Sequence, residues 1–449
     1  MANGKMVLLL NAPCDNRFFV SRQAPLGLLY IASYLRKHGV AVSLLDLNVM
    51  PFWRGRLNYL VKRFRPAIIG VSVNYSSRKE AVEICGIIKA ADPGITIVLG
   101  GPQPTISPGE FSASRADYII PYEGERAMLE FARAGSDRSA LKNVFSCRDA
   151  GLADLVRKAD RYPVEDLNNL PFPAYDLIDI RPYYINSYKR KPIVSVLTSR
   201  GCPNNCIFCS QAVSGRSWRA RSAGNVADEF EWLTGEIGAA EISIEDDNFT
   251  ADIGRVYEFC GLLRKRGISV PWQLANGVRA DRLTRDLLCE LKGSGCWKIA
   301  IAPEVGDDES MKRIRKGMNM EHFRKAARWC RETGMVYYAY FLMGFPFQGE
   351  KELRAIIDFA EELDPLLMDL SKIVPFPGTE IYDSLASGAG TDISYYYRGR
   401  DPLVERYYRK AYLDFYLRPG KLRRIISAIG LRQFYSLLRY ACRVLLAGR

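Results

Sequence analysis

Long apolar runs are missing from this 449-residue sequence. No window approaches the roughly 18 consecutive apolar residues that a membrane-spanning helix needs, which excludes a transmembrane protein. Met1 to Leu10 hold one lysine before a very short apolar run and no small-residue cleavage site, so a signal peptide is not expected either. We therefore expect a cytoplasmic protein. The length is too great for one ordinary core and predicts two or three domains.

Without a secretion signal, the eleven cysteines indicate reduced thiols and metal ligands rather than a disulfide framework. Three of them, Cys202, Cys206 and Cys209, stand close together. The others show no ligand spacing, and for most of them we expect the role of a small buried hydrophobe. They are Cys14, Cys85, Cys147, Cys260, Cys289, Cys296, Cys330 and Cys442.

The net charge of +13 is unevenly distributed, because residues 401–449 contain eleven Lys or Arg against three Asp or Glu. Such a segment can contact nucleic acid, an acidic membrane surface or an anionic substrate, although a solvated face is the commoner explanation. Residues 403–449 also mix Leu, Ile, Phe and Tyr with Arg in a way that suits a membrane surface. The expectations therefore include peripheral membrane contact and a hydrophobic small-molecule substrate, with no nucleic-acid partner.

The first third of the chain predicts a parallel α/β sheet, because short apolar runs recur at regular intervals between amphipathic stretches. Leu28, Ile31 and Leu35 lie at i, i+3 and i+7 of the first connecting helix, which ends at Gly39. The five expected strands are Val7–Leu10, Val40–Leu45, Ala67–Val71, Ile95–Leu99 and Tyr118–Ile120.

Polar or glycine-containing turns follow these strands, and in an open α/β sheet such strand ends form the ligand crevice. Gly100 and Gly101 would let a bulky planar cofactor approach the backbone. The alternative is tight turns without a ligand, because glycine serves turns everywhere. The turns are Asn11–Asp15, Ser72–Ser77, Gly100–Thr105 and Tyr122–Glu125.

A second series of six strand and helix units predicts a parallel barrel or partial barrel, with its chemistry at the C-terminal strand ends. Its expected strands are Ile193–Thr198, Glu241–Glu245, Trp272–Leu274, Trp297–Ala302, Val336–Met343 and Met368–Ile373. The expected domains are a Rossmann-like domain at 1–150, a proline-rich linker at 151–190, a (β/α)6 barrel at 191–390 and a helical basic region at 391–449.

Directly after the first barrel strand, residues 200–209 read RGCPNNCIFC, with the spacing Cys-x3-Cys-x2-Cys. Three thiolates on one loop can hold three irons of a 4Fe-4S cluster, whereas a structural zinc site or a ferredoxin site normally has a fourth protein ligand. No fourth cysteine lies nearby. The remaining iron can chelate the amino and carboxylate groups of S-adenosylmethionine, and one electron from the cluster then breaks a carbon–sulfur bond. An incidental zinc or thiol site is the alternative.

This loop, with Phe208 before the last cysteine, resembles the radical SAM superfamily. After the second strand, where the family often has Gly-Gly-Glu for the amino end of S-adenosylmethionine, this chain has EDDNFT at residues 245–250. The literal motif is absent, although the side chains at its centre can accept hydrogen bonds from an ammonium group. The resemblance implies a ribose contact for Glu304 and a place near the cofactor carboxylate or the substrate for Arg279, with structural ion pairs as the alternative. The candidate S-adenosylmethionine residues are thus Phe208, Asp246, Asp247, Asn248, Arg279 and Glu304.

Residues 1–150 resemble the cobalamin (B12)-binding, flavodoxin-like domain that precedes the barrel in one radical SAM subgroup. The likeness rests on PLGLLY at 25–30, GVS at 70–72, GGP at 100–102 and EGE at 123–125. It implies a cobalamin site that includes Ser72, Gly100, Gly101, Thr105 and Glu123.

Histidine is scarce, and neither His38 nor His322 lies in the Asp-x-His-x-x-Gly loop that supplies a lower axial ligand in many cobalamin proteins. His38 stands in the last turn of a helix and His322 opens another, so we expect structural roles for both. Cobalamin would then be bound without a histidine ligand. Gln103 is expected to be a surface turn residue, with an approach to that cobalamin face as the alternative.

The leading hypothesis is therefore a cobalamin-dependent radical SAM enzyme. The 5'-deoxyadenosyl radical would take hydrogen from an unactivated carbon, and methyl transfer in natural-product or lipid biosynthesis would follow. An external one-electron reductant of the flavodoxin or ferredoxin type is implied. The alternatives are a cobalamin-assisted cyclase or oxidase and, in another class, a non-catalytic iron-sulfur electron-transfer or sensor protein.

Overall fold

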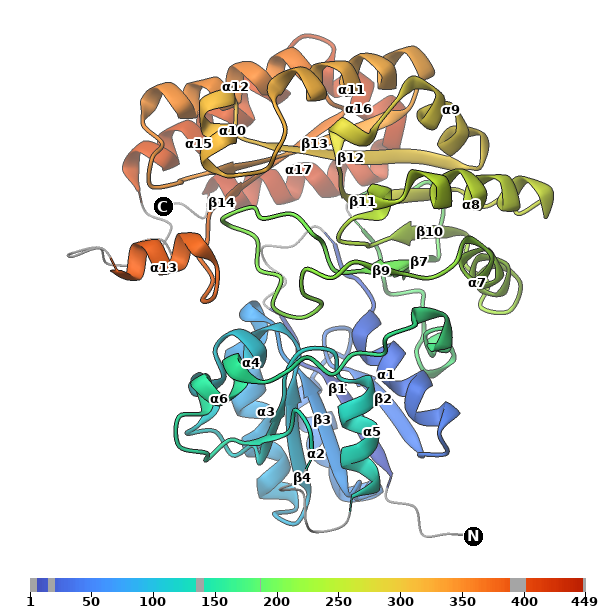
Figure 1. The fold of residues 1–449 in the computed structure, drawn as a ribbon, viewed down its shortest axis with the longest axis vertical. Helices are drawn as coiled ribbons and strands as arrows, with labels where there is room; N and C mark the ends of the chain where they lie inside the picture. The colour runs from blue at the N-terminus through green and yellow to red at the C-terminus, as the bar shows by residue number, and fades with distance from the viewer. Residues whose placement is uncertain (1–5, 15–20, 135–140, 186, 388–400, 447–449) are drawn as a thin grey trace. The chain divides into compact units, whose positions relative to one another are not determined.

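The computed structural model describes residues 6–14, 21–134, 141–185, 187–387 and 401–446, with side chains up to residue 439. The chain divides into two compact units (Figure 1). Unit 1 contains the first strand, residues 23–182 and the short segment 211–215, and unit 2 contains residues 18–22, 183–210 and 216–449. Each unit is built on its own sheet.

Unit 1 is a doubly wound α/β sheet with the strand order β2-β1-β3-β4-β5-β6, in which only the β5–β6 pair is antiparallel. Its strands are β1 (Val7–Asn11), β2 (Val42–Asp46), β3 (Ile68–Ser72), β4 (Thr96–Gly100), β5 (Tyr118–Ile120) and β6 (Phe145–Ser146). Its helices are α1 (Leu26–Lys37), α2 (Trp53–Phe64), α3 (Arg78–Ala91), α4 (Pro102–Ile106), α5 (Glu125–Arg133) and α6 (Leu152–Lys158). The order reverses between β1 and β3, so their C-terminal ends open the crevice that binds ligands in this fold.

Apolar side chains cover both faces of this sheet. On one face Leu57 and Val61 of α2 and Ile84 of α3 pack in one core cluster with strand residues such as Leu10 and Ile97. Helices α1 and α5 contact each other. Burial on both faces explains why the parallel strands read as continuous apolar runs, and the predicted sheet is confirmed.

Part of the segment expected as a linker packs with unit 1. Leu152 and Val156 of α6 join the same core cluster, and Val164, Leu167 and Leu170 form a second small cluster beside Tyr34. These buried residues follow no steady period through the prolines, which is why the sequence pattern did not reveal α6.

Unit 2 carries an all-parallel sheet with the order β14-β13-β12-β11-β10-β7, which is the chain order of the six predicted strands. They are β7 (Ile193–Val196), β10 (Glu241–Ile244), β11 (Trp272–Val278), β12 (Cys296–Glu304), β13 (Val336–Met343) and β14 (Leu367–Lys372). A small antiparallel pair, β8 (Ser199–Arg200) with β9 (Arg219–Ala220), stands apart. The predicted (β/α)6 partial barrel is confirmed.

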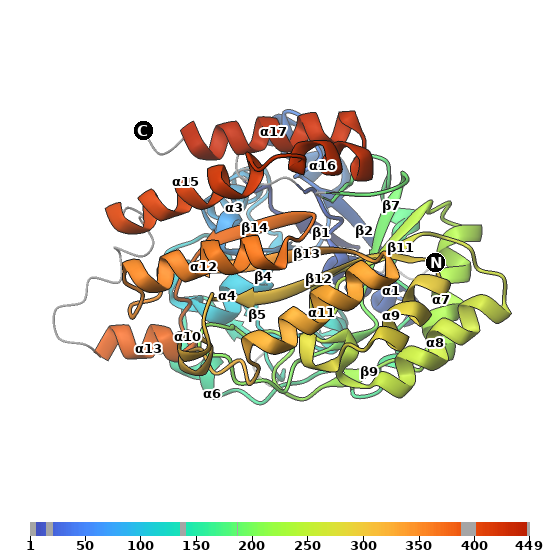
Figure 2. The same cartoon turned by 90° about the horizontal axis from the view of Figure 1, so that it is seen from above.

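Helices cover the outer face of this sheet in chain order, and α13 (Glu380–Ser387) and three C-terminal helices of the described residues follow the last strand, β14. The outer helices are α7 (Ala223–Gly235), α8 (Ile253–Lys265), α9 (Arg285–Gly293), α11 (Met320–Thr333) and α12 (Glu350–Leu363), with the short α10 (Asp308–Arg313) and α13 between strands and helices. The C-terminal helices are α15 (Pro402–Tyr416), α16 (Lys421–Ile429) and α17 (Leu431–Leu446), of which α16 and α17 lie side by side (Figure 2).

The C-terminal helices complete the inner side of the sheet. Ile425 and Ile429 of α16 pack on Ala300 and Tyr338 in one core cluster. Nearby, Lys298 is fully buried, and burial lowers its pKa to about 7. Within the part of the chain described, no helix is both long and apolar enough to cross a membrane.

Helix α15 protects the edge strand β14. The Tyr416 hydroxyl donates to the Met368 carbonyl at 2.7 Å and accepts from the Met368 amide at 3.0 Å. The Tyr412 hydroxyl lies 3.4 Å from the Leu370 carbonyl. These contacts satisfy main-chain groups that an exposed edge would offer to another strand.

Candidate active site

The cysteine loop is closed at its base and lies at the C-terminal end of β7. Residues 201–218 run between β8 and β9, whose antiparallel pairing holds the two ends of the loop together. The pKa of the Cys209 thiol is raised to about 12, first by desolvation and then by the Cys206 and Cys202 sulfurs. The Cys209 amide donates to the Cys206 carbonyl at 3.2 Å, so these two cysteines share one turn, and metal binding would have to displace the thiol proton of Cys209.

No group of three or more His, Cys, Asp or Glu side chains in the described ranges is arranged to hold a metal ion. A four-iron cluster does not need such convergence, because each thiolate binds a different iron. Thiolate is also the ligand type that iron-sulfur clusters take. The donor set of the loop therefore fits the cluster.

Contacts with the barrel exits fix the loop. Phe208 stacks edge to face on Phe345, with ring centroids 5.7 Å apart. The Ile207 amide donates to the Ile314 carbonyl at 3.2 Å, and the Ile207 carbonyl accepts from the Ile381 amide at 3.1 Å. Phe208 thus has a packing role, and its predicted contact with S-adenosylmethionine stays a prediction.

Arg279 and Asn204 connect the cysteine loop to the exit of β11. The Asn204 amide nitrogen lies 3.2 Å from the Cys202 sulfur, and its oxygen accepts from Arg279 Nη1 at 2.7 Å. Arg279 also donates to both Asp281 oxygens at 2.9 Å and to the Lys316 carbonyl at 3.2 Å. The Arg279 guanidinium has five N–H donors and makes four hydrogen bonds to protein groups. This geometry favours the structural role over capture of a cofactor carboxylate.

Asp246 ties the exit of β10 to the start of the cysteine loop. It is buried, and its oxygens accept from the Thr198 amide at 2.6 Å, the Thr198 hydroxyl at 2.5 Å and the Ser199 hydroxyl at 2.6 Å. Arg255 lies 3.8 Å from the same carboxylate. Asp247 instead accepts from the Gly201 amide at 3.2 Å. These bonds make Asp246 a positioning residue for the loop.

Replacement of Asp246 by Asn should destabilise the loop and lower its iron content. The Asn amide nitrogen is itself a donor, and it would face the donors of Thr198 and Ser199 that now bind the carboxylate. Each buried donor that loses its acceptor costs about 1–3 kcal/mol. Iron and sulfide analysis after anaerobic reconstitution, with the urea midpoint, measures the effect. Asp247→Asn makes the same change at the next residue and should stay near wild type. Equal iron content in the two variants would contradict the assignment.

Asn248 has the feature expected of a ligand contact. It is 5% exposed, and its side-chain oxygen is a buried acceptor without a hydrogen-bond partner among the described residues. Its carbonyl accepts from the Trp218 indole at 3.1 Å, which fixes the backbone. A buried acceptor of this kind usually has a partner, and an ammonium group would supply one. The site thus fits the amino end of S-adenosylmethionine.

We expect Asn248→Leu to weaken binding of S-adenosylmethionine about tenfold, which corresponds to one lost hydrogen bond to a charged group. Isothermal titration of the reconstituted protein with S-adenosylmethionine measures it. Asn58→Leu makes the same change on helix α2 of unit 1 and is the control. Unchanged affinity in Asn248→Leu would remove this residue from the cofactor site.

Glu304 ends β12 in a strained conformation. Its φ of 67° is in the left-handed region, which costs a non-glycine residue energy and often marks functional sites. The side chain is 11% exposed and pairs with Lys316 at 2.5 Å. Both the ribose contact and the structural ion pair remain compatible with this geometry. The sequence did not predict a role for Lys316, because only the fold brings it next to Glu304.

In unit 1 the two predicted cofactor glycines face protein backbone. Gly101 has φ 93°, and a Cβ there would lie 2.9 Å from the Val73 carbonyl. A Cβ on Gly100 would lie 3.3 Å from the Ile120 carbonyl. Both glycines are thus explained by turn geometry and close packing. Their contact with cobalamin stays a prediction.

The remaining unit 1 candidates lie around the same strand ends. The Thr105 hydroxyl donates to the Gly101 carbonyl at 2.9 Å and accepts from the Tyr122 amide at 3.0 Å. Ser72 ends β3, and Glu123 is 6% exposed. Gln103 is 2% exposed and donates to Glu110 at 3.1 Å, so the expectation of a surface turn residue was wrong.

Both histidines have structural contacts. His38 caps α1 and its Nδ1 lies 2.8 Å from the Tyr34 carbonyl. His322 forms a capping box with Asn319 at the start of α11. The structural roles expected for His38 and His322 are therefore seen, and binding of cobalamin without a histidine ligand stays a prediction.

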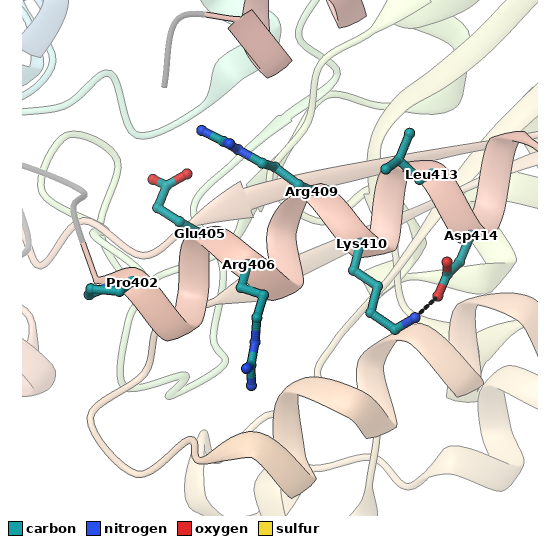
Figure 3. Close-up of a pocket in the computed structure, with 7 residues that line it drawn as sticks. All are labelled: Pro402, Glu405, Arg406, Arg409, Lys410, Leu413 and Asp414. Carbon is teal, nitrogen blue, oxygen red and sulfur yellow. Dashed lines mark ion pairs between the residues drawn. The ribbon is translucent and has the colours of Figure 1, made fainter. Parts of the chain in front are cut away.

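Figure 3 shows a surface pocket along α15, away from the predicted residues in sequence. Lys410 pairs with Asp414 at 2.9 Å, and Arg406 pairs with Glu350 at 2.7 Å. These ion pairs compensate its charges. Its lining residues are Pro402, Glu405, Arg406, Arg409, Lys410, Leu413 and Asp414.

A partial barrel with a three-cysteine loop after its first strand, preceded by a doubly wound domain, defines a radical SAM iron-sulfur enzyme with a cobalamin domain. Comparison with known families agrees. The Radical SAM superfamily model matches residues 196–360, and the B12 binding domain model matches residues 19–132. The chain therefore carries a radical SAM domain preceded by a B12-binding domain. A radical SAM domain implies a 4Fe-4S cluster and S-adenosylmethionine as cofactors, and a B12-binding domain implies cobalamin.

The chain is similar over most of its length to an uncharacterized methyltransferase of Pyrococcus horikoshii, with 27% identity and 93% of each chain covered. It is 25% identical to the anaerobic magnesium-protoporphyrin IX monomethyl ester cyclase of Rubrivivax gelatinosus, covering 80% of this chain and 66% of the cyclase. In fold it resembles the radical S-adenosylmethionine methyltransferase TsrM from Kitasatospora setae, solved with tryptophan and an analogue of S-adenosylmethionine. That match has a TM-score of 0.69, 20% identity and coverage of 85% and 76%.

Proposed function

We propose that this enzyme transfers a methyl group to an unactivated carbon of a small molecule. The observation that carries the proposal is the joint presence of a B12-binding domain and a barrel whose cysteine loop and Asn248 acceptor fit the cluster and S-adenosylmethionine. The methyltransferase named among the relatives covers nearly the whole chain, which supports the same reaction.

When bound, the reduced cluster supplies the electron that cleaves S-adenosylmethionine. The chain holds the parts in place. Cys202, Cys206 and Cys209 would bind the cluster, Asp246 would fix their loop, and Asn248 would accept from the amino end of the cofactor. In unit 1 the crevice at the ends of β1 and β3 would take cobalamin, with Ser72, Gly100, Gly101, Thr105 and Glu123 around it.

Product analysis under reducing conditions tests the reaction. The holoenzyme is incubated anaerobically with S-adenosylmethionine, titanium citrate and cobalamin. A methyltransferase should release S-adenosylhomocysteine as well as 5'-deoxyadenosine, because the methyl group leaves the sulfonium. Formation of 5'-deoxyadenosine alone would favour the cyclase or oxidase alternative, which the cyclase relative supports. Absence of both products would indicate the non-catalytic electron-transfer or sensor class.

The inner face of the barrel indicates where a substrate would bind. Of three tyrosines on β13, Tyr337 and Tyr338 are buried, whereas Tyr340 is half-buried and donates to the Ala275 carbonyl at 2.6 Å. Tyr340 pairs in register with Asp369 on β14, whose side chain is exposed. This combination favours a substrate with polar groups beside an apolar body over a plain hydrocarbon.

We also propose that the C-terminal helices contact a membrane surface. Large apolar side chains are exposed there, namely Leu413, Leu417, Leu422, Leu431, Tyr435 and Leu438. They lie among the excess arginines of residues 401–449, a combination typical of interfacial helices. The double variant Leu417→Asp with Leu431→Asp should abolish flotation of the full chain with vesicles containing 30% anionic lipid. Flotation equal to wild type would overturn this proposal.

A further inference from the structure

The amide of Asn204 lies between a predicted cluster ligand and a fixed cation. Its nitrogen is 3.2 Å from the Cys202 sulfur, and its oxygen is 2.7 Å from Arg279 Nη1. Asn204 is half-buried, and it stands in the loop between the first two cysteines. The carbonyl of Asn204 accepts from Arg216 at 3.0 Å, which holds the backbone of this residue.

Arg279 determines which end of the Asn204 amide faces the sulfur. A guanidinium has only donors, so the amide oxygen must point toward Arg279 and the NH2 group toward Cys202. A reversed amide would place two donors against each other. This reasoning assigns the amide from its partners, which is the sound basis for such an assignment.

Arg279 is itself held in place. Two parallel bonds of 2.9 Å join it to both oxygens of Asp281, which is the bidentate geometry that fixes a guanidinium plane. The Lys316 carbonyl receives a further bond at 3.2 Å. Arg279 is 16% exposed and Asp281 23% exposed at their side chains, so water screens the pair only in part. The chain Asp281, Arg279, Asn204 thus ends in an N–H group directed at sulfur.

We propose that Asn204 is a positioning residue that raises the reduction potential of the iron-sulfur cluster through an N–H to sulfur hydrogen bond to Cys202. Hydrogen bonds to cluster sulfurs are among the factors that set such potentials. The reduced cluster carries one more negative charge than the oxidised cluster, so a donor stabilises the reduced form more. Arg279 and Asp281 serve this bond by fixing the amide. The inference rests on the proposal that Cys202 is a cluster ligand.

The test compares Asn204→Asp with Asn205→Asp in the reconstituted full-length enzyme. Both variants add one negative charge to the same loop, but only the first removes the donor facing Cys202, because Asn205 is exposed. Midpoint potentials are measured by titration with dithionite and viologen mediators, followed by electron paramagnetic resonance at low temperature. We expect N204D to shift the equilibrium about tenfold further toward the oxidised cluster than N205D does, or ~59 mV for one electron.

A second variant leaves Asn204 in place. Arg279→Met removes the group that orients the amide, so the potential should fall in the same direction but by less than in N204D. Iron and sulfide content is measured for every sample. If N204D does not retain its cluster, Asn204→Leu and Arg279→Met are compared with wild type instead.

Fully loaded variants with the potential of N205D would overturn the inference. In that outcome the cysteine ligands and the proposed function still stand. A wild-type protein that takes up no cluster would instead refute the proposal that Cys202, Cys206 and Cys209 hold it. The two failures are therefore distinguishable by iron content alone.

Discussion

Replacement of Cys206 by Ala is expected to abolish formation of 5'-deoxyadenosine. Each thiolate of the loop would hold one iron, and two protein ligands cannot retain a cluster that already has one iron without a protein ligand. Without the cluster the chain has no source for the electron that cleaves S-adenosylmethionine. Production of 5'-deoxyadenosine, measured by liquid chromatography after anaerobic reduction, should therefore fall to the level of a protein-free sample.

Cys289→Ala is the matched control for this loss. Cys289 lies on α9 and is exposed, like a reactive surface thiol, but it belongs to no ligand pattern. Its replacement should leave iron content and 5'-deoxyadenosine formation unchanged. Zinc in the wild-type loop, or normal activity in Cys206→Ala, would contradict the radical mechanism.

The barrel was predictable because parallel strands are buried on both faces. In β12, from Cys296 to Glu304, every residue is buried, so the strand reads as a continuous apolar run with few exceptions. Lys298 is one of the buried polar residues of this strand, and its ammonium group donates to the Ser187 hydroxyl at 2.7 Å. The strands β6, β8 and β9 hold two residues each and leave no periodic signal.

The residues of the candidate site differ in the same way: some are related by local spacing in the sequence, and others come together only through the fold. The cysteine spacing is local, so the ligands could be found from the sequence. Asn204 and Arg279 are separated by 75 residues, and Thr198 and Asp246 by 48. Their contacts depend on strand order and register, which no local pattern contains.

Arg279 and Asp246 also show what residue types alone do not reveal. A carboxylate and a guanidinium at strand exits suit the two ends of an amino acid. The structure engages both with protein partners instead, through three short bonds at Asp246 and four at Arg279. Asn248 is the uncharged candidate of residues 245–250. Its side-chain oxygen is a buried acceptor that has no hydrogen-bond partner among the described residues.

Replacement of Gly306 by Ala adds only one methyl group, yet it is expected to lower the stability of the protein strongly. It follows β12, two residues after Glu304, and a Cβ there would overlap the backbone of Ala355 and Ile356 in α12. Ile356 is fully buried, so the helix cannot move aside without opening the core. We expect Gly306→Ala to lower the free energy of unfolding by about 3 kcal/mol, the upper range for an added core methyl group.

Gly261→Ala is the matched control, because a Cβ at that position in α8 meets nothing within 4 Å. Alanine is favoured over glycine in a helix by about 1 kcal/mol, so this variant should be slightly more stable than wild type. Urea unfolding followed by circular dichroism measures both.

The displaced helix in Gly306→Ala should also disturb Glu304 and weaken binding of S-adenosylmethionine, since that residue ends the same strand. A midpoint for Gly306→Ala at or above that of wild type would show that β12 and α12 do not approach as closely as described.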